Sequence, residues 1–240
     1  MLLSVVHLRN KLHDYDLNFD NVVSTYLKSV ELQAELVVYP EAALSGYAVI
    51  DSSTVTWLDE ELTYIYKLQQ YVQTYKTPIA IGAHSYDDVY VSVETYFLIT
   101  SDGIQTLKTK ERHNCIAAPM TPMVNSGTVF EIDSVVFSTL ICSESMCVSL
   151  LDSALSTSDV LLNPSAFGET QTPENYPLYS SVPDFNQKLI VIPNMSMIGD
   201  EYQYGRTTIK RGNRIVFEGS YLHNAVILFD TTTDTAYEKH

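Results

Sequence analysis

The sequence predicts a layered α/β domain, with either one mixed sheet or two sheets packed face to face. Short runs of apolar and β-branched residues alternate with segments in which apolar residues recur at helical spacing. Between these units lie stretches of alternating residues separated by turn sequences, which predict antiparallel strands. No internal repeat, low-complexity tract or linker rich in Gly, Pro and Ser divides the chain. We therefore expect one domain over residues 1–240.

In the first half of the chain, strands and helices are predicted in turn. Apolar and alternating runs predict strands at 2–8, 36–39, 78–83, 89–100 and 104–110. The first helix is predicted from one apolar face formed by Phe19, Val22, Val23, Tyr26, Leu27, Val30 and Ala34. A second amphipathic helix is predicted over about residues 57–75. Turns at Asp87-Asp88 and Ser101-Asp102-Gly103 join the later strands into a β-meander.

In the second half, the strands are shorter. Residues 112–127 contain two prolines and no periodicity, which predicts a loop. Strands are predicted at 129–132, 135–141, 160–162, 189–192, 207–210, 214–217 and 225–229. A helix is predicted after Cys142, from the spacing of Met146, Leu150, Leu151, Ala154 and Leu155. The polar, Pro-containing segment 168–186 is predicted to be partly helical.

The composition argues against partners with dense negative charge. The chain has 29 acidic and 14 basic residues, which gives a net charge of −15. Binding to nucleic acid or to an anionic membrane needs clustered Lys and Arg, but a cluster such as Lys108, Lys110 and Arg112 is only three residues wide. Three cysteines without framework spacing favour a reducing compartment, and the apolar N-terminus is too brief for a signal peptide. We therefore expect a cytoplasmic protein with no nucleic-acid or membrane partner.

Cys142 lies at the junction between a predicted strand and a predicted helix. Ser143 or Ser145 is available as the N-cap of that helix. The N–H groups at a helix start attract an anion and lower the pKa of a thiol, so Cys142 is a candidate nucleophile. A buried structural cysteine is the alternative that this position leaves open.

Glu41 and Lys110 also stand where predicted strands end. Reactive groups in layered α/β proteins gather at the carboxyl ends of strands, so we expect both side chains to lie near Cys142. A carboxylate could take the thiol proton, and an ammonium could hold developing negative charge. Lys108 shares a strand face with Lys110, and alternation alone does not separate the two lysines.

Several ordered motifs resemble those of the nitrilase superfamily of carbon–nitrogen hydrolases, whose triad is Glu, Lys and Cys in that order. The motifs are Val38-Tyr39-Pro40-Glu41-Ala42-Ala43-Leu44-Ser45-Gly46-Tyr47, Asp102-Gly103-Ile104-Gln105-Thr106-Leu107-Lys108-Thr109-Lys110, Leu140-Ile141-Cys142-Ser143-Glu144, Leu161-Leu162-Asn163-Pro164-Ser165-Ala166 and Tyr204-Gly205-Arg206-Thr207-Thr208-Ile209. The similarity spans essentially the whole chain. It implies a four-layer α-β-β-α sandwich, and its register favours Lys110 over Lys108 as the catalytic lysine.

The resemblance also implies a reaction and a set of site residues. Glu41 would be the general base, Cys142 would attack an amide or nitrile carbon, and Lys110 with the Ser143 N–H would form the oxyanion hole. Pocket candidates at strand ends and in comparable loops are Tyr47, Ser165, Ala166, Phe167, Asn194 and Met195. Glu144 beside the nucleophile is either a pocket residue or a carboxylate that stabilises the helix start. The implied substrates are small amides, carbamoyl compounds or, less favoured, nitriles. The resemblance implies no cofactor and no metal, and it implies a homodimer or higher homo-oligomer.

Two departures from the family pattern leave alternatives open. Many members have a second active-site glutamate after the lysine, whereas the only acid near that position here is Glu111. The residue after the nucleophile is commonly aromatic or acidic, and here it is Ser143. A catalytically weak binding or assembly protein, or an acyltransferase that uses the same thioester, are the main alternatives.

Two further site types are weaker hypotheses. A Cys–His–Asn protease would need one of His7, His13, His84, His113 or His223 beside Cys142, and none lies in a recognisable motif. A zinc site from His113, Cys115, Cys142 and Cys147 lacks paired Cys spacing.

Overall fold

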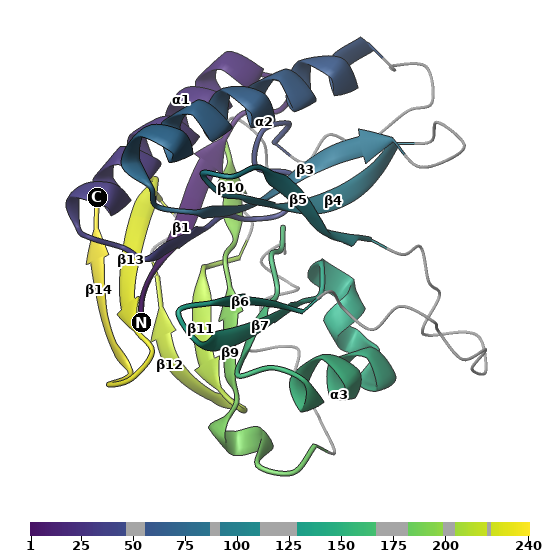
Figure 1. Cartoon of the computed structure of the whole chain (residues 1–240), viewed down its shortest axis with the longest axis vertical. Helices are drawn as coiled ribbons and strands as arrows, with labels where there is room; N and C mark the ends of the chain where they lie inside the picture. The colour runs from purple at the N-terminus through teal and green to yellow at the C-terminus, as the bar shows by residue number, and fades with distance from the viewer. Residues whose placement is uncertain (47–55, 87–91, 111–128, 167–181, 199–204, 220–221) are drawn as a thin grey trace.

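The computed structural model describes residues 1–46, 56–86, 92–110, 129–166, 182–198, 205–219 and 222–240. Within these ranges the chain forms two β-sheets that face each other, with helices on the outer side of each (Figure 1). This arrangement confirms the four-layer α-β-β-α sandwich. None of the described helices is long and apolar enough to cross a membrane.

The first sheet has β1 near its centre. In spatial order its strands are β14 (Thr235–Lys239), β13 (Ala225–Asp230), β1 (Leu2–Asn10), β2 (Leu36–Val38), β3 (Ile79–Tyr86), β4 (Ser92–Ile99) and β5 (Ile104–Thr109), and β10 (Met195–Met197) pairs with β1. Strands β1, β2 and β3 are parallel to one another, whereas β13 and β4 on either side are antiparallel to them. Helices α1 (Tyr15–Glu31) and α2 (Thr56–Tyr75) cover the outer face of this sheet (Figure 1).

The second sheet is smaller and has a parallel centre of its own. Its strands in order are β12 (Arg214–Glu218), β11 (Thr208–Arg211), β9 (Leu189–Ile192), β8 (Val160–Leu162), β7 (Val135–Thr139) and β6 (Phe130–Ile132). Strands β7, β8 and β9 are parallel. The 3₁₀ turn η1 (Cys142–Met146) and helix α3 (Val148–Ser156) follow β7, and a second 3₁₀ turn, η3 (Phe185–Gln187), precedes β9.

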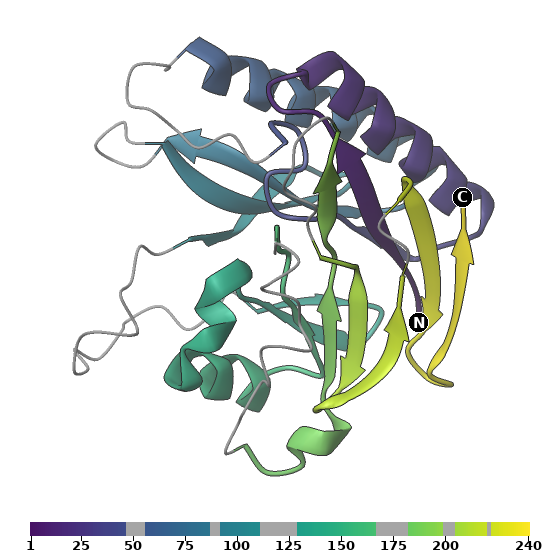
Figure 2. The ribbon, with the colours of Figure 1, turned by 180° about the vertical axis from the view of Figure 1, so that it is seen from behind.

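Two apolar layers hold these elements together. One lies between α1, α2 and the first sheet, and it includes Val22, Tyr26 and Leu68, all fully buried. The other joins the two sheets and α3, with Val38 from one sheet and Leu161 from the other. Strands β2 and β7 belong to the two facing sheets, which Figure 2 shows from behind, and each contributes a side chain to the layer between them.

Most predicted elements are confirmed within a few residues, and three differences have clear causes. β10 is only three residues long and follows Pro193, so it gives almost no pattern in the sequence. β14 is an edge strand whose residues are mainly exposed, and it lacks the apolar alternation of a half-buried strand. β7 ends at Thr139, because Leu140 and Ile141 already belong to the turn that leads to Cys142.

Candidate active site

The loop that contains Glu41 is fixed against β3 by a close backbone approach. The Ala43 N–H donates to the Gly82 carbonyl at 2.9 Å, and the Gly82 N–H donates to the Pro40 carbonyl at 3.2 Å. A Cβ atom at Gly82 would lie only 2.7 Å from the Glu41 Cα, so this position requires glycine. Ala42, directly after Glu41, has a φ of 49°. The Glu41 side chain is therefore held at the end of β2 and is 1% exposed.

Cys142 sits at a sharp turn that the neighbouring strand holds in place. Its φ is 51°, which is unfavourable for a residue with a side chain by about 1–3 kcal/mol. The Cys142 N–H donates to the Pro164 carbonyl at 2.8 Å. The Cys142 carbonyl accepts hydrogen bonds from Asn163 Nδ2 and Ser145 Oγ, both at 3.0 Å. These bonds to the segment after β8 explain how the strained backbone conformation persists.

The prediction that a helix start lowers the pKa of Cys142 is wrong. The turn η1 is a single five-residue 3₁₀ segment, and neither Ser143 nor Ser145 is its N-cap: Ile141 occupies that position. Burial and the nearby charge of Glu41 raise the pKa of the Cys142 thiol well above its usual value. Lys110 and the Ala166 backbone act in the opposite direction and are outweighed. The resting thiol is therefore protonated at neutral pH, and it needs a base to become a nucleophile.

Lys110 joins the Glu41 loop to the end of β5. Its Nζ lies 2.5 Å from Glu41 Oε1, and its backbone N–H donates to the Glu94 carbonyl at 2.8 Å. Burial lowers the pKa of Lys110, but the negative charges of Glu41, Cys142 and Glu94 outweigh burial and the net pKa is raised. Burial and the charge of Glu94 raise the pKa of Glu41 well above that of an ordinary carboxylate. Lys110 is thus a permanent cation, and Glu41 is a carboxylate with a strong tendency to take a proton.

Glu94 is a second carboxylate of this cluster, and the sequence analysis did not identify it. It lies on β4, and its Oε2 makes an ion pair with Lys110 Nζ. The sequence did contain a signal: Glu94, Tyr96 and Leu98 alternate along β4, and Tyr96 and Leu98 belong to the core between the sheets. An acid in phase with buried residues of a strand is a candidate site residue. Glu111, the acid considered from the sequence, lies outside the described residues.

Glu144 and Lys108 form a second buried pair. Glu144 accepts the Ile141 N–H on Oε2 at 2.7 Å, and its Oε1 lies 3.6 Å from Lys108 Nζ. Both side chains are 4% exposed. This geometry agrees with the structural interpretation of Glu144, which supports the turn before Cys142. It also places Lys110, and not Lys108, against Glu41.

The other predicted site residues differ in their burial and in their contacts with this cluster. Ser143 is exposed, and its N–H has no hydrogen-bond partner in the part of the chain that the structure describes. Ser165 is buried, with its hydroxyl bonded to the Asn163 carbonyl at 2.9 Å, while the next residue, Ala166, contacts the Cys142 thiol through its backbone. Tyr47 and Phe167 lie outside the described ranges.

Asn194 and Met195 lie at the point where the chain crosses from the second sheet to the first. The Asn194 N–H donates to Thr207 Oγ1 at 3.0 Å, and its side-chain oxygen accepts the Met195 N–H at 2.9 Å. Met195 is fully buried in the core under α1 and α2 and pairs with Leu8 in β10–β1. The described contacts of these two residues support the crossover and do not involve the Glu41–Lys110–Cys142 cluster.

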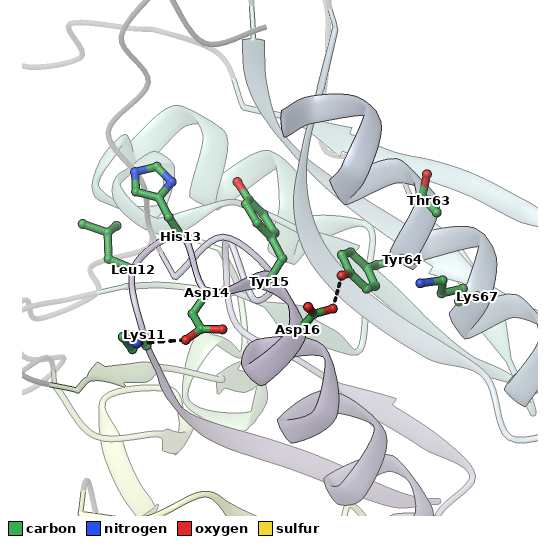
Figure 3. Close-up of a pocket in the computed structure, with 9 residues that line it drawn as sticks. All are labelled: Lys11, Leu12, His13, Asp14, Tyr15, Asp16, Thr63, Tyr64 and Lys67. Carbon is green, nitrogen blue, oxygen red and sulfur yellow. Dashed lines mark hydrogen bonds and ion pairs between the residues drawn. The ribbon is translucent and has the colours of Figure 1, made fainter. Parts of the chain in front are cut away.

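A pocket of about 540 Å³ lies elsewhere, between the segment after β1 and helix α2 (Figure 3). Its polar groups are largely paired with each other. Lys11 Nζ lies 3.0 Å from Asp14, and the Tyr64 hydroxyl donates to Asp16 at 2.5 Å. Lys67 lies over the Tyr64 ring, with Nζ 4.4 Å from its centroid. None of the predicted site residues lines this pocket, and its internal pairing points to no ligand.

Comparison with solved structures shows what fold this is. The chain aligns with an amidase from Nesterenkonia sp. AN1, in a glutamate variant that carries acrylamide added to the active-site cysteine, at a TM-score of 0.76. The two are 14% identical, over 96% of this chain and 92% of that one. A second variant of that protein, described as an amidase from the nitrilase superfamily, aligns at a TM-score of 0.75 with 14% identity over 95% and 90% of the two chains. The chain has the nitrilase fold.

A third structure of the same amidase shows the acetamide moiety of fluoroacetamide covalently added at its active-site cysteine. It aligns at a TM-score of 0.73 with 13% identity, over 95% of this chain and 89% of that one. The sequence matches no protein-family model and no curated protein. For this chain the nitrilase fold is therefore recognised from its structure, together with the motifs around Glu41, Lys110 and Cys142.

Proposed function

We propose that the chain is a thiol-dependent hydrolase of non-peptide carbon–nitrogen bonds, acting on a small amide or carbamoyl compound, and less readily on a nitrile. The observation that supports this most is the convergence of three groups from two sheets. Glu41 and Lys110 follow strands of the first sheet and pair at 2.5 Å, and Cys142 from the second sheet interacts electrostatically with both. A base, a cation and a nucleophile are the groups that acyl transfer requires.

The proposed reaction begins with a proton transfer. Glu41 takes the Cys142 proton, because its raised pKa and the raised thiol pKa make the carboxylate and the thiol plausible exchange partners. The thiolate sulfur attacks the substrate carbonyl carbon, and the negative charge moves to the carbonyl oxygen. Lys110 Nζ and the Ser143 N–H donate to that oxygen.

The second half of the reaction returns the enzyme to its starting state. Glu41 gives its proton to the leaving nitrogen, the C–N bond breaks, and an amine or ammonia leaves a thioester on Cys142. Glu41 then takes a proton from water, whose oxygen attacks the thioester carbon. The C–S bond breaks, the acid product leaves, and the proton returns to the thiol. Lys110 remains a cation throughout, since its pKa is raised.

Glu94 bears on the alternative that the chain is a weak or inactive binding protein. That alternative was based on the missing second glutamate of the family pattern, for which only Glu111 could substitute. Glu94 supplies a second carboxylate at Lys110 from β4 and therefore weakens the argument. We also propose a homodimer or higher homo-oligomer in the cytoplasm, as the family resemblance implies; sedimentation as a monomer at micromolar concentration would contradict the oligomer.

The test is a screen of simple amides, ω-amides, carbamoyl compounds and nitriles for ammonia release, with Cys142→Ala as the control. Hydrolysis should disappear in that variant, and intact mass measurement should detect an acyl adduct on the wild-type chain. Release that persists in Cys142→Ala would refute the site. An acyl adduct without hydrolysis, discharged by added hydroxylamine, would favour an acyltransferase. Silence in every assay would favour a binding protein.

A further inference from the structure

A second buried acid–base pair lies behind the Glu41 loop. Glu61 on α2 and His84 on β3 are 0% and 1% exposed, and Glu61 Oε2 lies 3.0 Å from His84 Nδ1. The proposed reaction uses neither residue. Burial lowers the pKa of His84, but Glu61 and Glu94 outweigh burial and the net pKa is raised. The imidazole is therefore biased towards its protonated, positively charged form.

This pair contacts the Glu41 loop directly. His84 Nδ1 also lies 3.4 Å from Ser45 Oγ, and Ser45 belongs to the loop that begins at Glu41. Ser45 is fully buried. The Ser45 carbonyl in turn accepts the His13 N–H at 3.0 Å, so the end of the loop is held from two sides.

The same pair lies beside the Lys110 cluster. His84 and Glu94 are direct partners in the antiparallel β3–β4 register. Burial raises the pKa of Glu94, but Glu41 and Lys110 lower it more strongly, and the charge of His84 adds to their effect. The charges of Glu94 and Lys110 in turn act on His84. Among the described residues, the ionisable groups that act on His84 are Glu61 from α2, Glu94 from β4 and Lys110 after β5.

The stability of the fold does not by itself explain why the Glu61–His84 pair is buried. A buried ion pair is commonly no more stabilising than apolar residues of similar volume, because both charges lose their hydration. Glu61 Oε1 is buried and has no hydrogen-bond partner among the described residues, so this carboxylate depends on His84. A costly pair that contacts the Glu41 loop and lies opposite Glu94 in the β3–β4 register has a role that the site itself explains.

We propose that Glu61 and His84 are positioning residues of the active site, which hold the Glu41 loop through Ser45 and keep Glu94 ionised beside Lys110. This inference rests on the proposed function. Glu61 stabilises the imidazolium, and the imidazolium stabilises the Glu94 carboxylate across the strand pair. Lys110 then stays between two carboxylates, and Glu41 keeps its orientation towards the thiol.

The kinetic test compares Glu61→Gln, His84→Gln and the double variant in the full-length protein. Each single variant should lower kcat about 10- to 100-fold with little change in KM, because it displaces the Glu41 base and leaves the substrate pocket in place. The double variant should be no worse than the poorer single one, since both remove the same link. Glu61→Asp, which keeps the charge, should recover part of the loss.

A matched control separates positioning from stability. Ser4 and Ser29 form another fully buried polar pair, 2.6 Å apart between β1 and α1. Ser29→Ala should lower the melting temperature without lowering kcat. If Glu61→Gln behaved in the same way, the pair would be structural only and the proposal would be overturned. Ser45→Ala, which removes one small contact of His84, provides a milder variant if the others fold poorly.

A second measurement does not depend on turnover. The His84 imidazole can be titrated by NMR in the wild type, in Glu61→Gln and in Glu94→Gln. Each substitution removes a negative charge that raises the pKa of His84, so both should shift the titration to lower pH. An unmoved titration in Glu94→Gln would overturn the link between the pair and the site. A shifted titration without any Cys142-dependent hydrolysis would instead refute the proposed function and leave the link standing.

Discussion

Lys108, near the end of β5, and Lys110, just after it, belong to very different ion pairs. Lys108 and Glu144 are both 4% exposed, and Glu144 uses its other oxygen on the Ile141 N–H. Lys110 is 18% exposed, and Glu41 Oε2 has no hydrogen-bond partner among the residues described. Both oxygens of Glu144 have a partner, whereas Glu41 Oε2 has none among the described residues. A Glu–Lys pair therefore supports the backbone at Glu144, whereas at Glu41 it leaves a carboxylate oxygen available for proton transfer.

A change of register between β4 and β5 precedes both lysines and places them on the same side of the strand. Lys108 lies opposite Tyr96, but the next pair, Phe97 and Thr106, skips one residue of β5. The irregularity places the consecutive residues Leu107 and Lys108 in buried positions, and Lys110 then follows the end of the strand with its N–H on the Glu94 carbonyl. Single substitutions of each member of the two pairs test directly whether the pairs differ in function.

The largest effect is expected from the two glutamates. Glu41→Gln should lower kcat by about 10²–10⁴-fold, because Gln does not exchange the proton in either half of the reaction. Glu144→Gln should lower the free energy of unfolding by about 1–3 kcal/mol, since a buried hydrogen-bonded charge is lost, and should leave kcat within about tenfold of the wild type. Steady-state kinetics and thermal denaturation measure both. The assignment would be wrong if the two variants exchanged these effects.

Substitutions of the two lysines should likewise differ: one should affect mainly activity and the other mainly stability. Lys110→Met should lower kcat by about 10²–10³-fold, because a donor to the developing oxyanion is lost. Lys108→Met leaves the buried Glu144 without its cation, which should cost about 3–5 kcal/mol of stability. Activity measured below the melting temperature of each variant separates the two outcomes. Equal kinetic losses would mean that both lysines serve the reaction.

A smaller effect is expected from the backbone contact that fixes the Glu41 loop. Gly82→Ala would place a Cβ atom 2.7 Å from the Glu41 Cα and from the Pro40 carbonyl oxygen, so the loop must shift. We expect kcat to fall about 10- to 100-fold from this displacement of the base. Gly103→Ala is the matched control, because a Cβ there meets no atom within 4 Å. Wild-type activity in Gly82→Ala would show that the loop tolerates the shift.

The smallest effect concerns the pH dependence of Cys142 alkylation. The pKa of the thiol is raised by burial and by the charge of Glu41, and Lys110 opposes this rise. Iodoacetamide labelling of Cys142 should therefore increase with pH beyond the range of an ordinary thiol near 8.5. The midpoint should move to lower pH in Glu41→Gln and to higher pH in Lys110→Met, and it should stay unchanged in Glu144→Gln. Peptide mass spectrometry, with the partly buried Cys147 as internal reference, measures these midpoints.

Features that depend on a single segment of the chain are predicted correctly from the sequence. The strand ends at Glu41, Lys110 and Cys142 follow from short apolar runs, and the layer order follows from their alternation with amphipathic helices. The pairing of Lys108 with Glu144 depends on a register change between two strands, which residue alternation does not encode. Glu94, His84 and Glu61 meet only because β3, β4 and α2 pack together. The pKa of Cys142 was predicted in the wrong direction because burial of the thiol is a property of the whole fold.

The division of the site between the two sheets has a consequence for how the protein can change. Glu41 and Lys110 follow strands of one sheet, and Cys142 follows a strand of the other. The apolar side chains between the sheets, such as Val38 and Leu161, therefore separate the two parts of the proposed site. Substitutions that add or remove volume in this layer alter catalytic geometry together with stability. If the proposed reaction takes place, its rate therefore depends on the packing of this layer as the stability does.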